Sequence, residues 1–395
     1  MSINQTILLL LIGYLIFTLD KKQENLPVPM ILVFIGIGLS FLPYFSTIEV
    51  TEHLIYHVFL PALLFVSAYR FPPEGFKRNS HLIIFLATIG IILTVGLLGA
   101  AIYAVSGPFL SLSLIGAMVM AAVLTPTDPV SVVSILKNST SDERMADVVE
   151  GESLLNDGTS IVIFSVLMGM YTGHSDVSLF SFFGEFLLVS LGGVGLGAAF
   201  GWLISKGVHY THNREYQVML SIVLAYGIFN LAEYVGVSGV LATVSAGLLL
   251  SFEYGKTIKE EHFKETLDGF WGVVETSALS LLFLLIGIEA AGYLAAPLLG
   301  LAVIVFLLSI VVRFVVIAGS TQLFPHWRRK ISWRHSALLT WAGLKGTMSI
   351  FLILSFEAEA DGGGSFTALA FAVVIISLVL QSVGVAPISK RLLKS

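Results

Sequence analysis

Three carboxylates and two basic side chains fall inside long apolar stretches of this sequence. The acids are Asp128, Glu152 and Asp157, and the bases are Arg313 and Lys345. An uncompensated charge in hydrocarbon costs at least about 2.5–3.5 kcal/mol. Each of these groups must therefore be paired or line a water-filled cavity. A carboxylate in such a cavity can bind a proton or a small cation.

Oxygen-bearing side chains accompany two of these acids at helical spacing. Ser153, Asn156 and Asp157 fall at i, i+3 and i+4 and share a helix face. Glu152 lies about 100° from Ser153 around the helix and can point to a different neighbour. A small hard cation prefers carboxylate, hydroxyl and carbonyl oxygens. We therefore expect Na⁺ to be bound by Asp157, the Ser153 hydroxyl and an oxygen of Thr127.

A purely structural role is the alternative for these acids. In that case they only neutralise the two buried bases, Arg313 and Lys345. We expect this role for Glu152. It fits Asp157 less well, because the two basic partners are too few to neutralise every buried acid.

Two of the apolar stretches contain residues that interrupt a helix. Two prolines fall within residues 125–130, and Lys345 lies between Gly343 and Gly346. A break at membrane depth is tolerated only where it is buried in protein or lines a cavity. A simple proline kink and a glycine-rich packing seam are the alternatives. Two interrupted helices in corresponding halves predict an inverted-repeat transporter site, with Lys345 offsetting the dipole ends of the crossing helices.

The composition places these stretches in a membrane. The 395 residues are 56% hydrophobic and 12% charged, whereas soluble domains carry about 25% charge. Mean hydropathy is +0.91. The absence of cysteine excludes disulfides and thiol chemistry. Basic residues scattered in short connections argue against a nucleic-acid partner. The sequence therefore predicts an all-α polytopic membrane protein.

We predict about thirteen transmembrane helices. They cover residues 4–19, 28–42, 50–69, 80–105, 110–136, 144–171, 179–205, 215–234, 237–252, 266–291, 297–321, 332–356 and 365–389. All but two of the 21 basic residues fall in connections on one side of this arrangement. The positive-inside rule then predicts an N-terminus outside and a C-terminus in the cytoplasm of the cell membrane.

The interrupted helices also predict a division of the chain. Residues 1–178, with helices 1–6, would form the first inverted repeat. Residues 206–395, with helices 8–13, would form the second, and helix 7 at 179–205 would link them.

Several motifs resemble the NhaP/NHE-type monovalent cation/proton antiporters over essentially the whole chain. They are Thr-Asp-Pro at 127–129, Glu-Ser-Leu-Leu-Asn-Asp-Gly-Thr at 152–159, Arg313, and Gly-Leu-Lys-Gly at 343–346. The Asn-Asp pair is the most specific of these signals. The resemblance implies an NhaA-like antiporter fold and a homodimer. It also implies a core ion-transport domain from helices 3–6 and 10–13, with the remaining helices forming a dimerisation domain.

The resemblance also implies residue roles. It implies that Asp157 is the carboxylate that binds the ion and the proton, with Asn156 as its structural neighbour. Ser153 and Thr127 would be further cation ligands, and Asp128 would be part of the unwound crossing. Glu152 and Arg313 would form a buried ion pair. An Asn-Asp pair is associated with electroneutral exchange in this superfamily.

Two positions depart from the family pattern. Val66 stands where relatives usually carry an acid that contributes to the cation site, which removes a ligand. Lys345 stands where many relatives have arginine, which keeps the charge but loses the bidentate fork.

We therefore expect a secondary antiporter that exchanges Na⁺ for H⁺ by alternating access, because Asp157 can hold a proton or a cation but not both. We expect no enzymatic activity and no cofactor, with membrane lipid and a second copy as partners. A K⁺/H⁺ or mixed antiporter is the alternative. A cation channel is less favoured because no repeated carbonyl filter appears. An intramembrane enzyme lacks the HExxH and Gly-x-Ser-x-Gly motifs.

Overall fold

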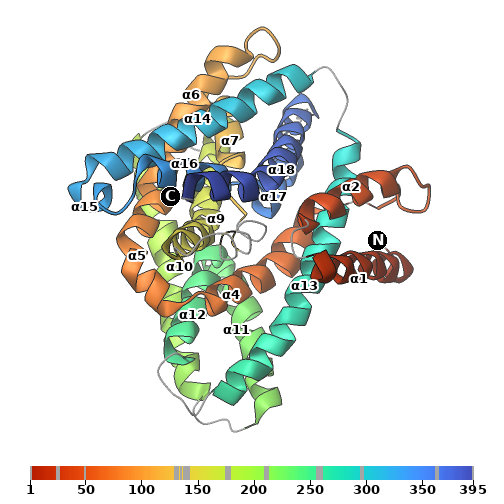
Figure 1. Ribbon diagram of the computed structural model, residues 1–395, viewed down its shortest axis with the longest axis vertical. Helices are drawn as coiled ribbons and strands as arrows, with labels where there is room; N and C mark the ends of the chain where they lie inside the picture. Colours follow the sequence, from red (N-terminus) through yellow and green to blue (C-terminus); the bar gives the residue numbers. More distant parts are fainter. Residues whose placement is uncertain are drawn as a thin grey trace.

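The computed structural model describes residues 2–23, 27–48, 50–128, 133, 136, 143–173, 179–208, 213–254, 261–293, 298–360 and 364–393. Over these ranges every regular element is a helix (Figure 1). The predicted all-α class is therefore confirmed.

The first half of the chain comprises α1 (Ile3–Gln23), α2 (Val28–Ser40), α3 (Glu52–Leu54), the π-helix η1 (Ile55–Phe59), α4 (Leu60–Arg70), α5 (Pro73–Phe85), the π-helix η2 (Leu86–Gly90), α6 (Ile91–Ser106), α7 (Leu114–Val123) and α9 (Glu143–Tyr171). The second half comprises α10 (Leu179–Val208), α11 (Arg214–Val235), α12 (Gly239–Tyr254), α13 (Glu261–Ala291), α14 (Leu299–Leu323), α15 (Pro325–Arg328), α16 (Trp333–Ala342), α17 (Thr347–Glu359) and α18 (Gly364–Leu393).

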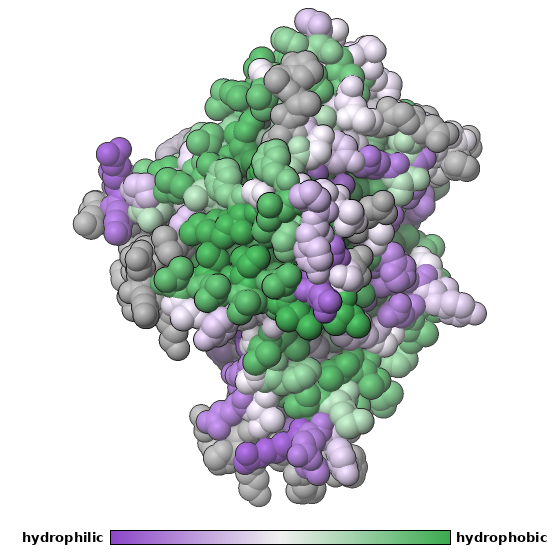
Figure 2. Space-filling model, turned by 90° about the vertical axis from the view of Figure 1, so that its right-hand side faces the viewer, coloured by the Kyte–Doolittle hydropathy of each residue, from purple (hydrophilic) through white to green (hydrophobic). Residues whose placement is uncertain are grey.

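Eight of the described helices are long and apolar enough to cross a membrane, or nine if the bent pair α16–α17 is one span. Four shorter apolar helices, α1, α2, α7 and α12, correspond to the remaining predicted spans. Figure 2 shows a largely hydrophobic face with hydrophilic residues gathered at its lower end and margins. The protein is a multi-pass membrane protein. The count of thirteen spans stays a prediction.

Local sequence explains several helix boundaries. The Ser332 hydroxyl accepts a hydrogen bond from the His335 backbone N–H in a capping box that begins α16. The Ser113 side chain caps α7 in the same way, through Gly116 N–H. Gly236 ends α11 in the left-handed conformation at φ 82°, where a residue without a Cβ is unstrained.

Helix α9 lies at the centre of the molecule. In its membrane window 67% of residues are buried, against 22% in α10 and 33% in α11, so those two helices lie at the periphery. Gly36 of α2 and Gly287 of α13 bring these two backbones into direct contact, because a Cβ on Gly287 would lie 2.9 Å from Gly36 Cα.

The division into two inverted repeats and a linker helix stays a prediction, as does the assignment of helices to core and dimerisation domains. Among the described elements, α4 packs most extensively against α12, and α13 against α2.

Both predicted helix interruptions are confirmed. Helix α7 ends at Val123, and residues 124–128 are not helical, which is more than a proline kink. The span formed by α16 and α17 breaks at residues 343–346 and bends by 51°. The prediction that the fifth span continues to residue 136 falls almost entirely outside the described residues.

Candidate functional site

The two interrupted segments cross and bond to each other. Asp128 N–H donates to the Leu344 carbonyl oxygen at 2.8 Å, and the Thr347 hydroxyl donates to Asp128 Oδ2 at 3.4 Å. Asp128 is 8% exposed. Gly346 is required for this approach, because a Cβ at that position would overlap the Asp128 side chain. The predicted place of Asp128 in the unwound crossing is therefore observed.

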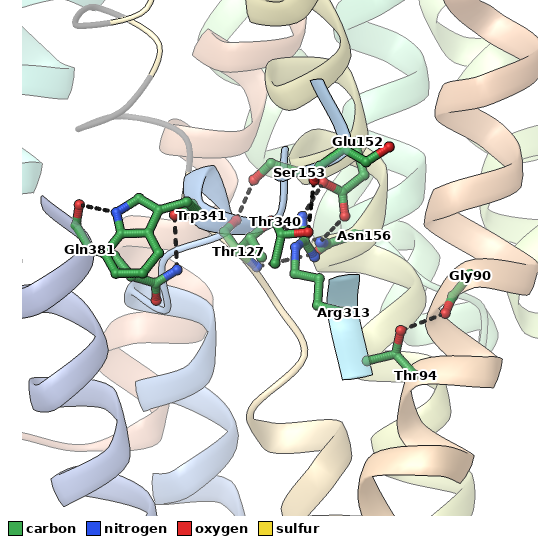
Figure 3. Close-up of polar contacts among 11 residues, drawn as sticks. Gly90, Thr94, Thr127, Glu152, Ser153, Asn156, Arg313, Thr340, Trp341 and Gln381 are labelled. Carbon is green, nitrogen blue, oxygen red and sulfur yellow. Dashed lines mark hydrogen bonds and ion pairs between the residues drawn. The ribbon is translucent and has the colours of Figure 1, made fainter. Parts of the chain in front are cut away.

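Hydrogen bonds to α18 stabilise the crossing. Trp341 Nε1 donates to the Gln381 carbonyl oxygen at 3.2 Å, and Gln381 Nε2 donates to the Trp341 carbonyl oxygen at 2.9 Å (Figure 3). This reciprocal pair satisfies a carbonyl at the end of α16 that the helix itself leaves free. The end of α16 is thereby fixed next to the break.

Asn156 links the first interrupted segment to α9. Its Nδ2 donates to Thr127 Oγ1 at 2.9 Å and to Glu152 Oε1 at 3.2 Å, and its Oδ1 accepts from Thr127 N–H at 3.3 Å. The Ser153 hydroxyl donates to the Thr127 carbonyl oxygen (Figure 3). Asn156 is fully buried. Thr127 is thus held by two side chains one turn apart on α9.

Glu152 and Arg313 form the ion pair that the sequence predicted. Arg313 Nη2 lies 2.6 Å from Glu152 Oε2, with side chains 12% and 6% exposed (Figure 3). The Arg313 guanidinium lies against Gly343, where a Cβ would overlap it. Among the residues that the structure describes, Arg313 Nε has no hydrogen-bond partner. The pair ties α14 to α9 beside the crossing.

Asp157 has a different environment from the other acids. It lines a cavity, and its buried Oδ1 has no hydrogen-bond partner within the described ranges. A carboxylate oxygen in this position can accept a proton or coordinate a cation. No ion pair joins Asp157 to Lys345 in the described structure.

The cavity has a volume of about 390 Å³. It brings together the three predicted Na⁺ ligands, because Thr127, Ser153 and Asp157 all line it. Asn156, Glu152, Arg313 and Lys345 do not line it. The other lining residues are Leu60, Leu63, Leu64, Ser67, Arg70, Asp128, Val133, Glu150, Leu154, Glu275, Leu279, Thr347 and Met348.

Lys345 lies in the break between α16 and α17 and is 4% exposed. Its backbone N–H donates to the Ser377 hydroxyl at 3.0 Å. Its ammonium makes no hydrogen bond or ion pair with another described residue. The predicted position between two helix ends is observed, and its electrostatic role there stays a prediction.

The sequence argument missed an ion pair in the cavity wall. Arg70 at the end of α4 pairs with Glu275 of α13 and donates from Nη2 to the Asp268 carbonyl oxygen at 2.9 Å. The predicted third span ends at residue 69, so Arg70 falls in the connection that follows it. The sequence does contain a pattern that indicates this position. Leu60, Leu63, Ser67 and Arg70 are spaced so that they share one helix face, which would place Arg70 on the same surface as the others.

Val66 does not belong to that surface. It is fully buried in an apolar cluster with Phe65, Tyr69 and Ala242, on the side of α4 that faces α12. Ser67 lines the cavity instead.

Comparison with known proteins adds to this geometry. Residues 7–391 match the family described as "Sodium/hydrogen exchanger, transmembrane". The Na⁺/H⁺ antiporter NhaG of Bacillus atrophaeus is 32% identical over 95% of this chain and 72% of its own length. The Na⁺/H⁺ antiporter NhaH of Halobacillus aidingensis is 31% identical over 98% of this chain and 97% of its own. The fold matches the solved structure of the sodium proton antiporter MjNhaP1 from Methanocaldococcus jannaschii, with a TM-score of 0.79, 18% identity and coverage of 100% and 99% of the two chains.

Proposed function

The chain belongs to the sodium/hydrogen exchanger family and is a sodium/proton antiporter, and we propose that one carboxylate, Asp157, carries both ions in turn. The observation that carries the proposal is its position in the cavity wall with a buried oxygen that lacks a hydrogen-bond partner in the described structure. Leaving such an acceptor unsatisfied costs about 1–3 kcal/mol. A proton or a cation removes that cost, and the two compete because they need the same oxygen.

The cation site also includes Ser153 and Thr127. In the described state the Ser153 hydroxyl donates to the Thr127 carbonyl oxygen. Rotation of the hydroxyl hydrogen away from Thr127 leaves lone pairs of both oxygens free for a cation at Asp157 without moving the backbone. Asn156 is a positioning residue, because its two hydrogen bonds to Thr127 fix that segment against α9. Asp128 adds negative charge from the crossing and lines the same cavity.

Alternating access is supported by a second cavity along α9. It has a volume of about 210 Å³ and is lined by Ile161, Val162, Ser165 and Val166 of α9, together with residues of η1, α10 and α11. The first cavity contacts α9 through Glu150, Ser153, Leu154 and Asp157. The first cavity therefore contains Asp157 and extends from it toward the N-terminal end of α9. The second cavity lies beyond Asp157 toward the C-terminal end of the same helix.

Aromatic side chains at the second cavity support a closed outer route in this state. Tyr56 lines the second cavity and stacks on Phe351 of α17, with ring centroids 4.5 Å apart and planes at 13°. The first cavity reaches Arg70, which precedes one of the connections rich in basic residues. The positive-inside rule predicts that this connection lies in the cytoplasm, which supports an inward-open state. Movement of α9 and the crossing relative to α4 and α13 would expose Asp157 to the second cavity.

One exchanging carboxylate also implies electroneutral exchange, with one monovalent cation for one proton. We infer a homodimer in the cell membrane, with the N-terminus outside and the C-terminus in the cytoplasm. The low burial of α10 and α11 supports a surface covered by lipid or by a second copy. Exchange of K⁺ as well as Na⁺ is the second candidate, because Val66 carries no carboxylate and lies in an apolar cluster outside the cavity, so this turn of α4 adds no acid to the site.

The test uses purified protein in liposomes that contain a pH-sensitive dye. We expect Na⁺ pulses to drive proton movement in the unmodified protein and not in Asp157→Asn. Glu357→Gln is the matched control, because it makes the same change at an exposed carboxylate that Tyr293 bonds far from the cavity. Full exchange by Asp157→Asn would overturn the single-carboxylate mechanism. Parallel pulses of Na⁺, K⁺ and Li⁺ decide between the two candidate substrates, and a valinomycin-clamped potential tests electroneutrality.

A further inference from the structure

The break between α16 and α17 removes a hydrogen bond that a continuous helix would contain. In an α-helix each backbone N–H donates to the carbonyl oxygen four residues earlier, so Lys345 N–H would donate to Trp341. Here both groups bond to α18 instead. Lys345 N–H donates to the Ser377 hydroxyl at 3.0 Å, and the Trp341 carbonyl oxygen accepts from Gln381 Nε2 at 2.9 Å (Figure 3). Two side chains of α18 thus replace the partner that each backbone group would have in a continuous helix.

These two side chains also bond to each other. Ser377 and Gln381 lie one turn apart on α18, and both are fully buried. The Ser377 hydroxyl donates to Gln381 Oε1. A continuous chain of three hydrogen bonds therefore runs from Lys345 N–H through the hydroxyl and the amide to the Trp341 carbonyl oxygen. We call this chain the α18 relay. Each of its links satisfies a buried polar group, and such groups are costly to leave without a partner.

The indole ring of Trp341 fixes the position of the relay along α18. Its Nε1 donates to the Gln381 carbonyl oxygen at 3.2 Å (Figure 3), so Gln381 is bonded to Trp341 through both its side chain and its backbone. The ring lies against Gly384, where a Cβ would lie 2.6 Å from two ring atoms. The absence of a side chain at Gly384 therefore allows the end of α16 to approach α18 closely enough for these bonds.

The α18 relay acts on the exchange site through a residue between its two ends. Leu344 lies between Trp341 and Lys345 in the chain, and its carbonyl oxygen accepts from Asp128 N–H at 2.8 Å. In a continuous helix that carbonyl would instead accept from the N–H four residues later. Keeping the break open therefore keeps the Leu344 carbonyl directed at Asp128, which lines the cavity beside Thr127.

We propose that Ser377 and Gln381 are positioning residues for the exchange site. The α18 relay competes with the helical hydrogen bond between Lys345 and Trp341, and it holds the second interrupted helix in the geometry that the crossing needs. Neither side chain is among those that line the cavity, so both act on a cation at Asp157 only through the crossing. The inference rests on the proposed function of that cavity and assigns part of its cation affinity to two side chains outside it.

The first test changes Gln381 in the full chain and measures Na⁺-driven proton movement in liposomes, per amount of folded protein. Gln381→Leu keeps a similar volume but removes both side-chain hydrogen bonds of the relay. We expect its KM for Na⁺ to rise about tenfold, the size that follows from losing one buried hydrogen bond.

Gln381→Glu separates hydrogen bonding from packing, because it preserves the shape of the side chain. The introduced carboxyl can donate to the Trp341 carbonyl oxygen only while it is protonated. Its KM, divided by that of the unmodified protein at the same pH, should therefore be near one at acid pH and rise as the pH increases. The corresponding ratio for Gln381→Leu should stay high at every pH.

Ser377 supplies a second series, which carries the test if Gln381→Leu does not fold. Ser377→Ala removes the acceptor for Lys345 N–H and should raise KM, whereas Ser377→Thr retains a hydroxyl and should restore most of the affinity. Ser382→Ala is the matched control and should leave KM unchanged. Ser382 is a buried serine of the same helix, and its hydroxyl has no hydrogen-bond partner among the described residues.

A lower unfolding temperature with an unchanged KM in Gln381→Leu and Ser377→Ala would overturn the inference, because the relay would then be a packing contact only. A KM ratio of Gln381→Glu that does not vary with pH would also overturn it. Failure of the proposed function would appear in a different variant, since Asp157→Asn would then retain full exchange whatever the relay variants do.

Discussion

The Glu152 carboxylate accepts hydrogen bonds from both Arg313, 161 positions away in the chain, and Asn156 one turn along α9. Asn156 in turn holds Thr127 in the interrupted segment. The buried ion pair is therefore continuous with the segment that supplies the cation ligands. We therefore expect the ion pair to affect mainly the stability of the protein, because Asn156 links it to the cation ligands.

Removing one partner of this ion pair should destabilise the protein. Glu152→Ala leaves the Arg313 guanidinium buried without its counter-charge, which costs about 3–5 kcal/mol. We expect a large fall in the midpoint of thermal unfolding in detergent, with the Na⁺ affinity of the surviving protein nearly unchanged. The double variant Glu152→Gln/Arg313→Met should recover much of the loss, because it leaves no unpaired charge. Unchanged stability together with weakened Na⁺ binding would instead make Glu152 part of the cation site.

Gly346→Ala should separate the two interrupted segments. The added Cβ would overlap Cβ and the carboxylate of Asp128, and the Asp128 backbone is fixed nearby because its N–H is bonded to the Leu344 carbonyl oxygen. We expect exchange to fall at least tenfold, that is by about 1.4 kcal/mol or more, with a lower unfolding temperature. Gly195→Ala in α10 is the matched control, because nothing lies within 4 Å of its added Cβ. Equal activity of the two variants would show that the crossing tolerates expansion.

The helix breaks were predictable because they depend on local residue types. The Glu152–Arg313 pair was predictable because a charge inside an apolar stretch needs a partner of opposite charge. Prolines and glycines act on their own turn of backbone, and few buried acids were available for Arg313. The Arg70–Glu275 pair was not predictable in this way, since its partners lie 205 positions apart and span boundaries had placed Arg70 in a loop. The orientation of Val66 away from the cavity also depends on helix phase, which the π-turn of η1 alters just before α4.

Arg70→Gln should increase the apparent affinity for Na⁺. It removes a positive charge from the cavity wall and leaves the Glu275 carboxylate facing the same space. We expect a severalfold lower KM for Na⁺ in liposome exchange, with the largest difference at low ionic strength, where charges act over longer distances.

Arg70→Lys and the double variant Arg70→Gln/Glu275→Gln serve as controls for this change. Both keep the net charge of the pair and should keep the KM close to that of the unmodified protein. A KM that stays constant in Arg70→Gln while exchange is lost at every Na⁺ concentration would identify Arg70 as a packing contact between α4 and α13.

The two cavities on either side of Asp157 should open to opposite faces of the membrane. The chain contains no cysteine, so a single introduced thiol reports its own accessibility without background. Ser67→Cys lies in the first cavity and Ser165→Cys in the second. We expect a membrane-impermeant maleimide to label Ser67→Cys from the cytoplasmic face and Ser165→Cys from the outer face. Ser309→Cys, at a position only 4% exposed, should react from neither. Labelling of both cavity positions from one face would mean that the cavities belong to a single vestibule, and Asp157 could then not alternate between two sides.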